Sequence, residues 1–192
     1  MSAAKALSPE QLHEIHTIIA TPDLPDLGPK VRADIKASDQ LKRELEAIPS
    51  YARLTNGTQA LIYASALLWH DHLKEAHRIV QDDASTEAAF IHGIVHRREP
   101  DYSNAKYWFH RVGAHATFPT IAARVEKLLA GHQAETSPAF ISGGAWQPMP
   151  FIDACEKVAH RPQTDPEVKL LQQIQWIEFK ILLEHLCRND SD

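Results

Sequence analysis

Helix-start signals recur along this chain, whereas the alternating patterns typical of strands hardly occur. The first signal lies at residues 8–11, where SPEQ offers a serine N-cap, a proline suited to the first helical position and a glutamine that completes a capping box. The last lies at residues 164–166, where TDP precedes an apolar stripe over residues 168–182 at helical spacing. The chain is therefore expected to begin and end its ordered part with helices.

Short segments rich in proline, glycine or polar residues divide the rest of the chain into further helices. The main breaks are TPDLPDLGPK at residues 21–30, DDAST at 82–86 and EPDYS at 99–103. The pattern predicts an all-α fold. The expected helices cover residues 8–19, 31–47, 56–69, 73–80, 86–97, 104–112, 120–130, 152–159 and 164–182, with an irregular loop over residues 134–150.

The length and composition favour a single domain over residues 1–192, built as an array or bundle of short helix pairs. The chain has 192 residues, of which 44% are hydrophobic and 23% charged, enough for one hydrophobic core. We expect its parts to be N-terminal helices over residues 1–50, central helix pairs over 54–131, the loop at 134–150 and C-terminal helices over 151–188.

Charge and composition also exclude several function classes. The net charge is -5 and the pI about 6.2, so no overall basic field exists to hold a nucleic acid. Cys155 and Cys187 lack a CxxC spacing and are expected to be buried, reduced thiols. No apolar run approaches a membrane span and no signal peptide is evident, so we expect a cytoplasmic protein without a membrane partner.

Two stretches of the central region repeat a common arrangement. WHDHLKEAHRIV at residues 69–80 and HRREPDYSNAKYWF at residues 96–109 each place a charged turn before a helix that carries a small alanine, Ala76 or Ala105. The two alanines are about thirty residues apart, and an aromatic side chain follows the second. This arrangement resembles the tetratricopeptide class of helical repeats and implies helix pairs that stack side by side.

A second resemblance rests on longer motifs. They are LLWHDHLKEAHRIVQ, FIHGIVHRREPDYSNAKYWFHRVG, AWQPMPFIDACE and LQQIQWIEF, in this order between residues 67 and 179. With these motifs the chain is similar to an uncharacterised family of small helical bacterial and fungal proteins. The resemblance implies no activity. The segment VGAHATFP at residues 112–119 departs from the pattern expected there, because Ala116 stands where a proline would be expected.

The histidines of the central region suggest a metal site. His92 and His96 are four residues apart, so their side chains lie on one helical face and could reach the same ion. Stacked helix pairs bring successive turns together, so His70 or His72 could supply a third ligand. We name His92, His96 and His70 as candidate ligands of a divalent transition metal. The sequence HGIVH lacks the glutamate of HExxH, so the metalloprotease base is absent.

The turn after the two histidines carries carboxylates that could take part in the same site. Glu99 or Asp101 could complete a mixed nitrogen and oxygen ligand set suited to zinc, nickel, iron or manganese. Alternatively, either acid could orient His96 for acid–base chemistry without a metal. A third interpretation is purely structural, because histidines at helix ends can cap carbonyl groups.

A cluster of basic residues suggests an anionic ligand. It consists of Arg97, Arg98, Lys106 and Arg111, and paired arginines suit bidentate capture of a carboxylate or phosphate. The alternative is that the arginines pair with neighbouring carboxylates such as Asp71 and lock the turns together.

Two functions of different classes follow. The first is binding of a small anionic ligand or a metal ion, with or without catalysis, in a cleft lined by residues 70–72 and 92–108 and covered by the 134–150 loop. The second is a helical-repeat module that binds a protein partner and has no catalytic activity. Trp108 is expected in the core or at the edge of the cleft. The ligand-binding residues that we predict are His70, His72, His92, His96, Arg97, Arg98, Glu99, Asp101, Lys106 and Trp108.

Overall fold

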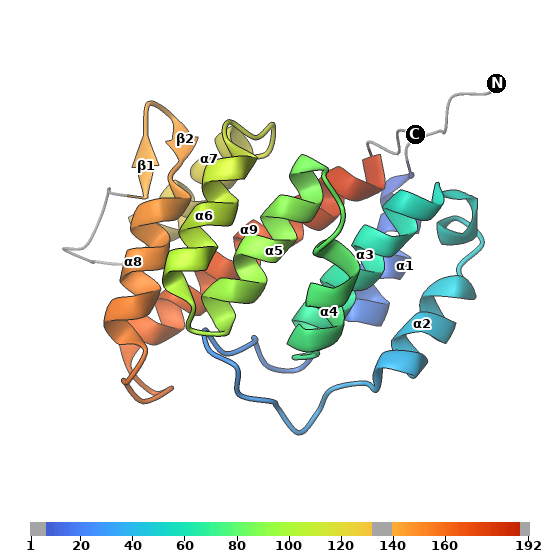
Figure 1. Cartoon of the computed structure of the whole chain (residues 1–192), viewed down its shortest axis with the longest axis horizontal. Coiled ribbons are helices and arrows are strands. Elements are labelled where there is room, and N and C mark those ends of the chain that lie inside the picture. The colour runs from blue at the N-terminus through green and yellow to red at the C-terminus, as the bar shows by residue number, and fades with distance from the viewer. Residues whose placement is uncertain (1–6, 132–139, 189–192) are drawn as a thin grey trace.

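The computed structural model describes residues 7–131 and 140–188 and confirms a predominantly all-α fold (Figure 1). In the described residues the helices are α1 (Pro9–Ile19), α2 (Ser38–Glu46), the short 3₁₀ helix η1 (Tyr51–Arg53), α3 (Asn56–Trp69), α4 (Leu73–Val80), α5 (Thr86–Arg98), α6 (Tyr102–Val112), α7 (Phe118–Ala130), α8 (Pro148–Val158) and α9 (Pro166–Arg188). Two strands, β1 (Ile141–Ser142) and β2 (Ala145–Trp146), form a small antiparallel hairpin.

The long helix α9 organises the packing. Figure 1 shows α9 running behind the row formed by α3, α5, α6 and α8, and α9 contacts α3, α7 and α8 directly. Consecutive helices α3 and α4, α4 and α5, and α5 and α6 also pack against one another. The helices thus bury their apolar faces partly on their chain neighbours and partly on α9, which places α4, α5 and α6 next to each other around the polar central motif.

Side-chain caps fix where several helices begin. Ser8 accepts a hydrogen bond from the backbone N–H of Gln11, whose side chain accepts one from the Ser8 N–H, so the predicted capping box is confirmed. Asp101 caps α6 by accepting a hydrogen bond from the backbone N–H of Asn104. Thr55 caps α3, because it has the extended backbone of an N-cap and accepts a hydrogen bond from the N–H of Thr58.

The helix predicted over residues 31–47 is wrong in its first half, because α2 forms only the second half. The backbone N–H of Arg32 donates to Asp71 Oδ2 at 3.0 Å, and that of Lys36 donates to His70 Nδ1 at 3.0 Å. These two N–H groups serve the turn between α3 and α4 and are not used in a helix. The segment before α2 is therefore non-helical and is tied to that turn by its backbone.

The predicted irregular loop over residues 134–150 is also more regular than expected. Residues 134–139 lie outside the described part, and the remainder contains the β1–β2 hairpin and the first turn of α8. Gly143 and Gly144 form the hairpin turn with φ of 58° and 73°, the left-handed conformation that two-residue hairpin turns favour. Strand β2 packs on α7.

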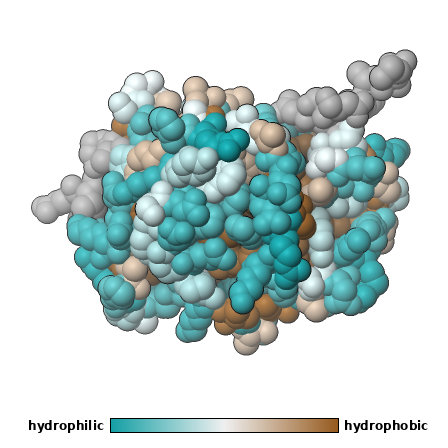
Figure 2. Space-filling view, viewed as in Figure 1, coloured by the Kyte–Doolittle hydropathy of each residue, from teal (hydrophilic) through white to brown (hydrophobic). Residues whose placement is uncertain are grey.

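The viewed face is mainly polar. Figure 2 shows hydrophilic residues over most of this face, with hydrophobic residues visible in a band right of centre and in a patch near its lower edge. Among large hydrophobic side chains of the described residues, those exposed are Val31 at 61% and Tyr107 at 54%. None of the helices within residues 7–131 and 140–188 has the length and apolar character needed to cross a bilayer. Cys155 and Cys187 are buried free thiols, as expected, and burial raises the pKa of each to about 12.

Candidate functional site

Helices α4 and α5 bring three histidines together. His77 of α4 and His92 and His96 of α5 each offer a ring nitrogen, and these nitrogens lie within 4.8 Å of one another. The ring centroid of His77 is 4.5 Å from that of His92 and 5.1 Å from that of His96. The rings of His92 and His96 stack at 4.7 Å, which confirms that the spacing of four residues places both on one face. We call these three residues the histidine cluster.

His92 is the most enclosed member of the histidine cluster. Its side chain is buried, and neither ring nitrogen has a hydrogen-bond partner among the described residues. Trp108 of α6 stacks on the ring at 3.9 Å between centroids, and the guanidinium of Arg111 lies 5.0 Å from the Trp108 ring. Burial, reinforced by the positive charge that His77, His96 and Arg111 can carry, lowers the pKa of His92 to about 3. His92 is therefore neutral at neutral pH, the form in which histidine binds metals.

His96 lies at the acidic edge of the histidine cluster. Its Nδ1 is 3.5 Å from Glu99 Oε2 and 3.9 Å from Asp101 Oδ2, and the side-chain amide of Asn104 lies 3.2 Å from its Nε2. Burial lowers the pKa of His96, although Glu99 and Asp101 oppose this shift. The predicted juxtaposition of His96 with both carboxylates is thus present, and these acids surround its outer side.

The two polar turns that the sequence singled out meet at an open pocket. Asp71 and His72, from the turn after α3, line it together with Glu99, from the turn after α5, and its volume is about 380 Å³. Because Glu99 also contacts His96, the pocket reaches the acidic edge of the histidine cluster.

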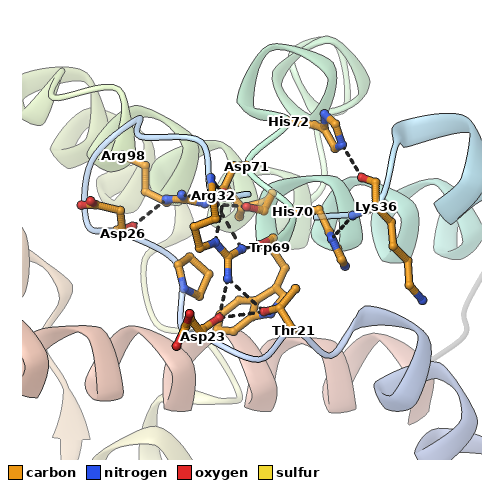
Figure 3. A network of polar contacts seen from close by, with 12 residues as sticks. Thr21, Asp23, Asp26, Arg32, Lys36, Trp69, His70, Asp71, His72 and Arg98 are labelled. Atoms are coloured by element: carbon orange, nitrogen blue, oxygen red, sulfur yellow. Dashed lines mark hydrogen bonds and ion pairs between the residues drawn. The ribbon is translucent and has the colours of Figure 1, made fainter. Parts of the chain in front are cut away.

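His70 has a structural role instead of the predicted role as a metal ligand, whereas His72 both contacts the backbone and lines the open pocket. His70 accepts from the Lys36 N–H through Nδ1, which leaves the proton on Nε2, 3.1 Å from the Ile19 carbonyl oxygen (Figure 3). His72 Nε2 lies 2.8 Å from the Lys36 carbonyl oxygen. Both ring nitrogens of His70 are engaged with backbone groups, so the candidate metal ligand His70 is corrected to His77. Burial lowers the pKa of His70 to about 4.

Asp71, between these two histidines, joins three segments of the chain. Its carboxylate accepts from Arg98 at 2.7 Å and from the Arg32 Nε at 2.8 Å (Figure 3). Arg98 also donates to the carbonyl oxygens of Leu68 and Asp26. Burial alone would raise the pKa of Asp71, but the hydrogen bonds from both arginines lower it. Arg98 is therefore fully committed to holding the turns together.

Arg97 points to a different part of the core. It donates to Glu178 of α9 at 2.6 Å, with both side chains 0% exposed, and its guanidinium lies 4.6 Å from the Phe151 ring. Trp146 of the hairpin donates to the same glutamate at 3.2 Å. Lys106 pairs with Asp153. The expected capture of an anion by Arg97 and Arg98 is therefore corrected, because both arginines are buried against carboxylates of the chain itself.

His77 is the member of the histidine cluster that sequence reasoning missed. A signal for it existed, because Leu73, Ala76, His77 and Val80 follow the spacing of a buried helical stripe. The sequence could not show which end of α4 lies beside His92. The two helices pack so that the middle of α4, rather than the turn before it, faces the histidines of α5.

Comparisons with protein families, curated proteins and solved structures gave no significant match. The similarity to a bacterial and fungal family and the tetratricopeptide-like repeat therefore stay predictions.

Proposed function

We propose that the chain binds a divalent transition metal ion through His77, His92 and His96. The main support for this proposal is His92. Its side chain is buried, and neither ring nitrogen has a hydrogen-bond partner among the described residues. Two further imidazoles, those of His77 and His96, lie next to it. A buried polar group without a partner is costly, and such groups in native proteins call for an explanation. A metal ion shared by the histidine cluster would satisfy a His92 nitrogen.

The chemistry of the cluster favours zinc, nickel, copper or iron. Neutral imidazoles are common ligands of these metals, and three protein ligands leave a position for water or a substrate. The carboxylates of Glu99 and Asp101 lie near Nδ1 of His96. A carboxylate in such a position can orient a metal-ligating histidine and increase its basicity. Trp108 closes one side against solvent by stacking on His92.

The alternative interaction module has less support. A helical groove for a protein partner should expose a contiguous apolar surface. The exposed large hydrophobic residues of the described chain are Val31 and Tyr107, which lie on the segment before α2 and on α6. Two scattered side chains are ordinary for a protein surface.

Metal binding can be tested with tag-free protein stripped by a chelator and then dialysed against Zn²⁺. The key variant is His92→Phe, which keeps an aromatic ring against Trp108 but removes both nitrogens. We expect it to bind one equivalent of zinc less than the parent. His77→Gln should lose the same equivalent, because it removes a second ligand from another helix.

The matched control is His110→Ala, which removes an exposed histidine of α6 and should leave the zinc content unchanged. A parent protein that binds no zinc, or a folded His92→Phe variant that binds as much as the parent, would refute the proposal. Circular dichroism and thermal unfolding establish that each variant is folded before its zinc content is compared.

A further inference from the structure

A second group of potential metal ligands lies outside the histidine cluster. Glu87 at the start of α5, His115 in the connection before α7 and His185 near the end of α9 each offer a ligand atom, and these atoms lie within 4.8 Å of one another. Glu87 Oε1 is 3.2 Å from His185 Nε2 and 3.8 Å from His115 Nε2. Three segments that are distant in the sequence therefore direct two imidazoles and one carboxylate to the same point.

His115 is the member whose surroundings most need an explanation. Its side chain is 3% exposed and packs against Phe90 and Phe118, with ring centroids at 5.3 Å and 5.8 Å. Its Nε2 is buried and has no hydrogen-bond partner in the described part of the chain. The 3.8 Å separation from Glu87 is too long for a hydrogen bond, so an ion pair with Glu87 does not satisfy this nitrogen.

The other nitrogen of His115 is held by Thr117. Nδ1 lies 2.7 Å from Thr117 Oγ1 and 3.2 Å from the Thr117 backbone nitrogen. A proton on Nδ1 can be donated to the hydroxyl oxygen, which leaves the lone pair of Nε2 directed at Glu87 and His185. Metal-ligating histidines are commonly oriented by such a hydrogen bond from their other nitrogen. The Thr117 backbone N–H donates to Nδ1 and so favours the tautomer with the proton on Nε2. A cation bound at Nε2 would move this proton to Nδ1, where the Thr117 hydroxyl oxygen can accept it, at the expense of the hydrogen bond from the backbone N–H.

We propose that Glu87, His115 and His185 form a second divalent-metal site, separate from the histidine cluster. Two histidines and one carboxylate bind Fe²⁺, Mn²⁺, Co²⁺ or Zn²⁺ and leave coordination positions for other ligands. The two sites share no ligand. Glu87 precedes His92 by a little more than one turn of α5, so the sites use different segments of one helix, with these two residues about 7.5 Å apart along its axis.

The two sites differ in ligand type, which separates their metal preferences. The histidine cluster presents nitrogen only, whereas Glu87 adds an anionic oxygen that harder cations favour. Mn²⁺ is therefore expected to bind at the second site more tightly than at the histidine cluster. Zn²⁺ and Co²⁺ are expected at both.

The test is equilibrium dialysis of the full chain with Co²⁺, using single variants of each site. The parent should bind two equivalents. Glu87→Gln keeps the size of the side chain but removes its charge, and we expect it to weaken one equivalent by at least about tenfold, the effect of losing a ligand-supporting group. His92→Phe should lose the other equivalent, and the double variant should bind neither.

Two exposed positions provide matched controls. Glu126→Gln and His160→Gln make the same chemical changes away from the site and should retain both equivalents. His185→Gln repeats the test at a different ligand if Glu87→Gln does not fold. In the parent, Zn²⁺ should also shift the imidazole NMR resonances of His115 and His185, and His92→Phe should preserve these shifts.

The outcomes distinguish the two proposals. A parent that binds one equivalent, lost in His92→Phe, supports the histidine cluster and overturns the second site. One equivalent that is weakened at least about tenfold in Glu87→Gln and kept in His92→Phe supports the second site alone. Unchanged binding in folded Glu87→Gln and His185→Gln, or unshifted His115 and His185 resonances, overturns it as well.

Discussion

The carboxylate of Asp71 neutralises two arginines, and its backbone has φ of 62°, a left-handed conformation that aspartate tolerates better than most residues. Asp71→Asn keeps the shape but leaves buried Arg98 without its counter-charge. Loss of one partner of a buried pair typically costs about 3–5 kcal/mol. We expect a decrease of this size in the free energy of unfolding, measured with urea.

The control for this prediction is Asp34→Asn, which changes an exposed aspartate and should alter stability by no more than about 0.5 kcal/mol. If both variants unfolded at the same urea concentration, Asp71 would not be the junction of the three segments.

His70 predicts a dependence of stability on pH. Its pKa is about 4 in the folded protein, against 6.5 for an unperturbed histidine, so between these values the unfolded chain binds more protons than the folded one. Stability contributed by neutral His70 is thus present above pH 6.5 and is lost as pH falls towards 4. Between pH 7 and 5 the loss from this residue is about 1–2 kcal/mol.

The measurement is urea unfolding of the metal-free parent and of His70→Gln at both pH values. The variant is less stable at pH 7 because it loses a backbone contact, but its stability should fall less on acidification. Equal pH dependence in the two proteins would show that His70 is protonated equally in the folded and unfolded states. The pKa of His92 is also lowered, so His92 makes stability depend on pH in the same direction. This contribution is present in both the parent and His70→Gln and cancels when the two are compared.

At the scale of the element, α5 and α6 approach closely at Gly93. A Cβ atom at this position would lie 2.7 Å from two ring carbons of Phe109, which is itself buried. Gly93→Ala should therefore destabilise the protein by about 1–3 kcal/mol, because the buried ring has little freedom to move. Thermal or urea unfolding measures this effect.

The same substitution in α3 serves as the control. At Gly57 an added Cβ would have no heavy atom within 4 Å, so Gly57→Ala should stabilise the chain by roughly 0.4–1 kcal/mol through the lower entropy of the unfolded state. A neutral or stabilising Gly93→Ala would contradict the close contact between α5 and α6.

Local sequence patterns predicted most of the helices, but they did not predict which residues come together in the candidate sites. The capping box at Ser8 depends on neighbouring residues, so the sequence was sufficient to predict it. The register between α4 and α5 depends on the packing of whole helices, so the third histidine was sought in the turn before α4 and not in α4 itself. The non-helical segment before α2 is likewise held by hydrogen bonds from Arg32 and Lys36 to a turn far along the chain.

Contacts between residues far apart in the sequence were even harder to predict. Arg97 and Arg98 are adjacent in the sequence and predicted a common anion site, yet a helical backbone points neighbouring side chains in different directions. One reaches Glu178 and the other Asp71. The group of Glu87, His115 and His185 has no local pattern at all, because it spans almost one hundred residues and depends on where α9 ends.

At the scale of the whole molecule, the two proposed metal sites connect different parts of the fold. The histidine cluster joins α4 to α5, whereas Glu87, His115 and His185 join the start of α5 to the connection before α7 and to the end of α9. A ligand that binds only the folded state raises the free energy of openings that break its site. Each metal ion should therefore slow hydrogen exchange in its own region.

At free Zn²⁺ about one hundredfold above the dissociation constant, this stabilisation is about 2.7 kcal/mol, or nearly one hundredfold slower exchange through such openings. In the parent, hydrogen-exchange mass spectrometry should show added protection both in α4 and at the C-terminal end of α9. His92→Phe should lose the protection of α4 and keep that of α9, and Glu87→Gln should show the reverse. A metal ion bound at one site slows hydrogen exchange only for amides whose opening breaks that site. Equal protection of both regions in every variant would therefore mean that zinc acts on global unfolding and does not stabilise the two regions separately.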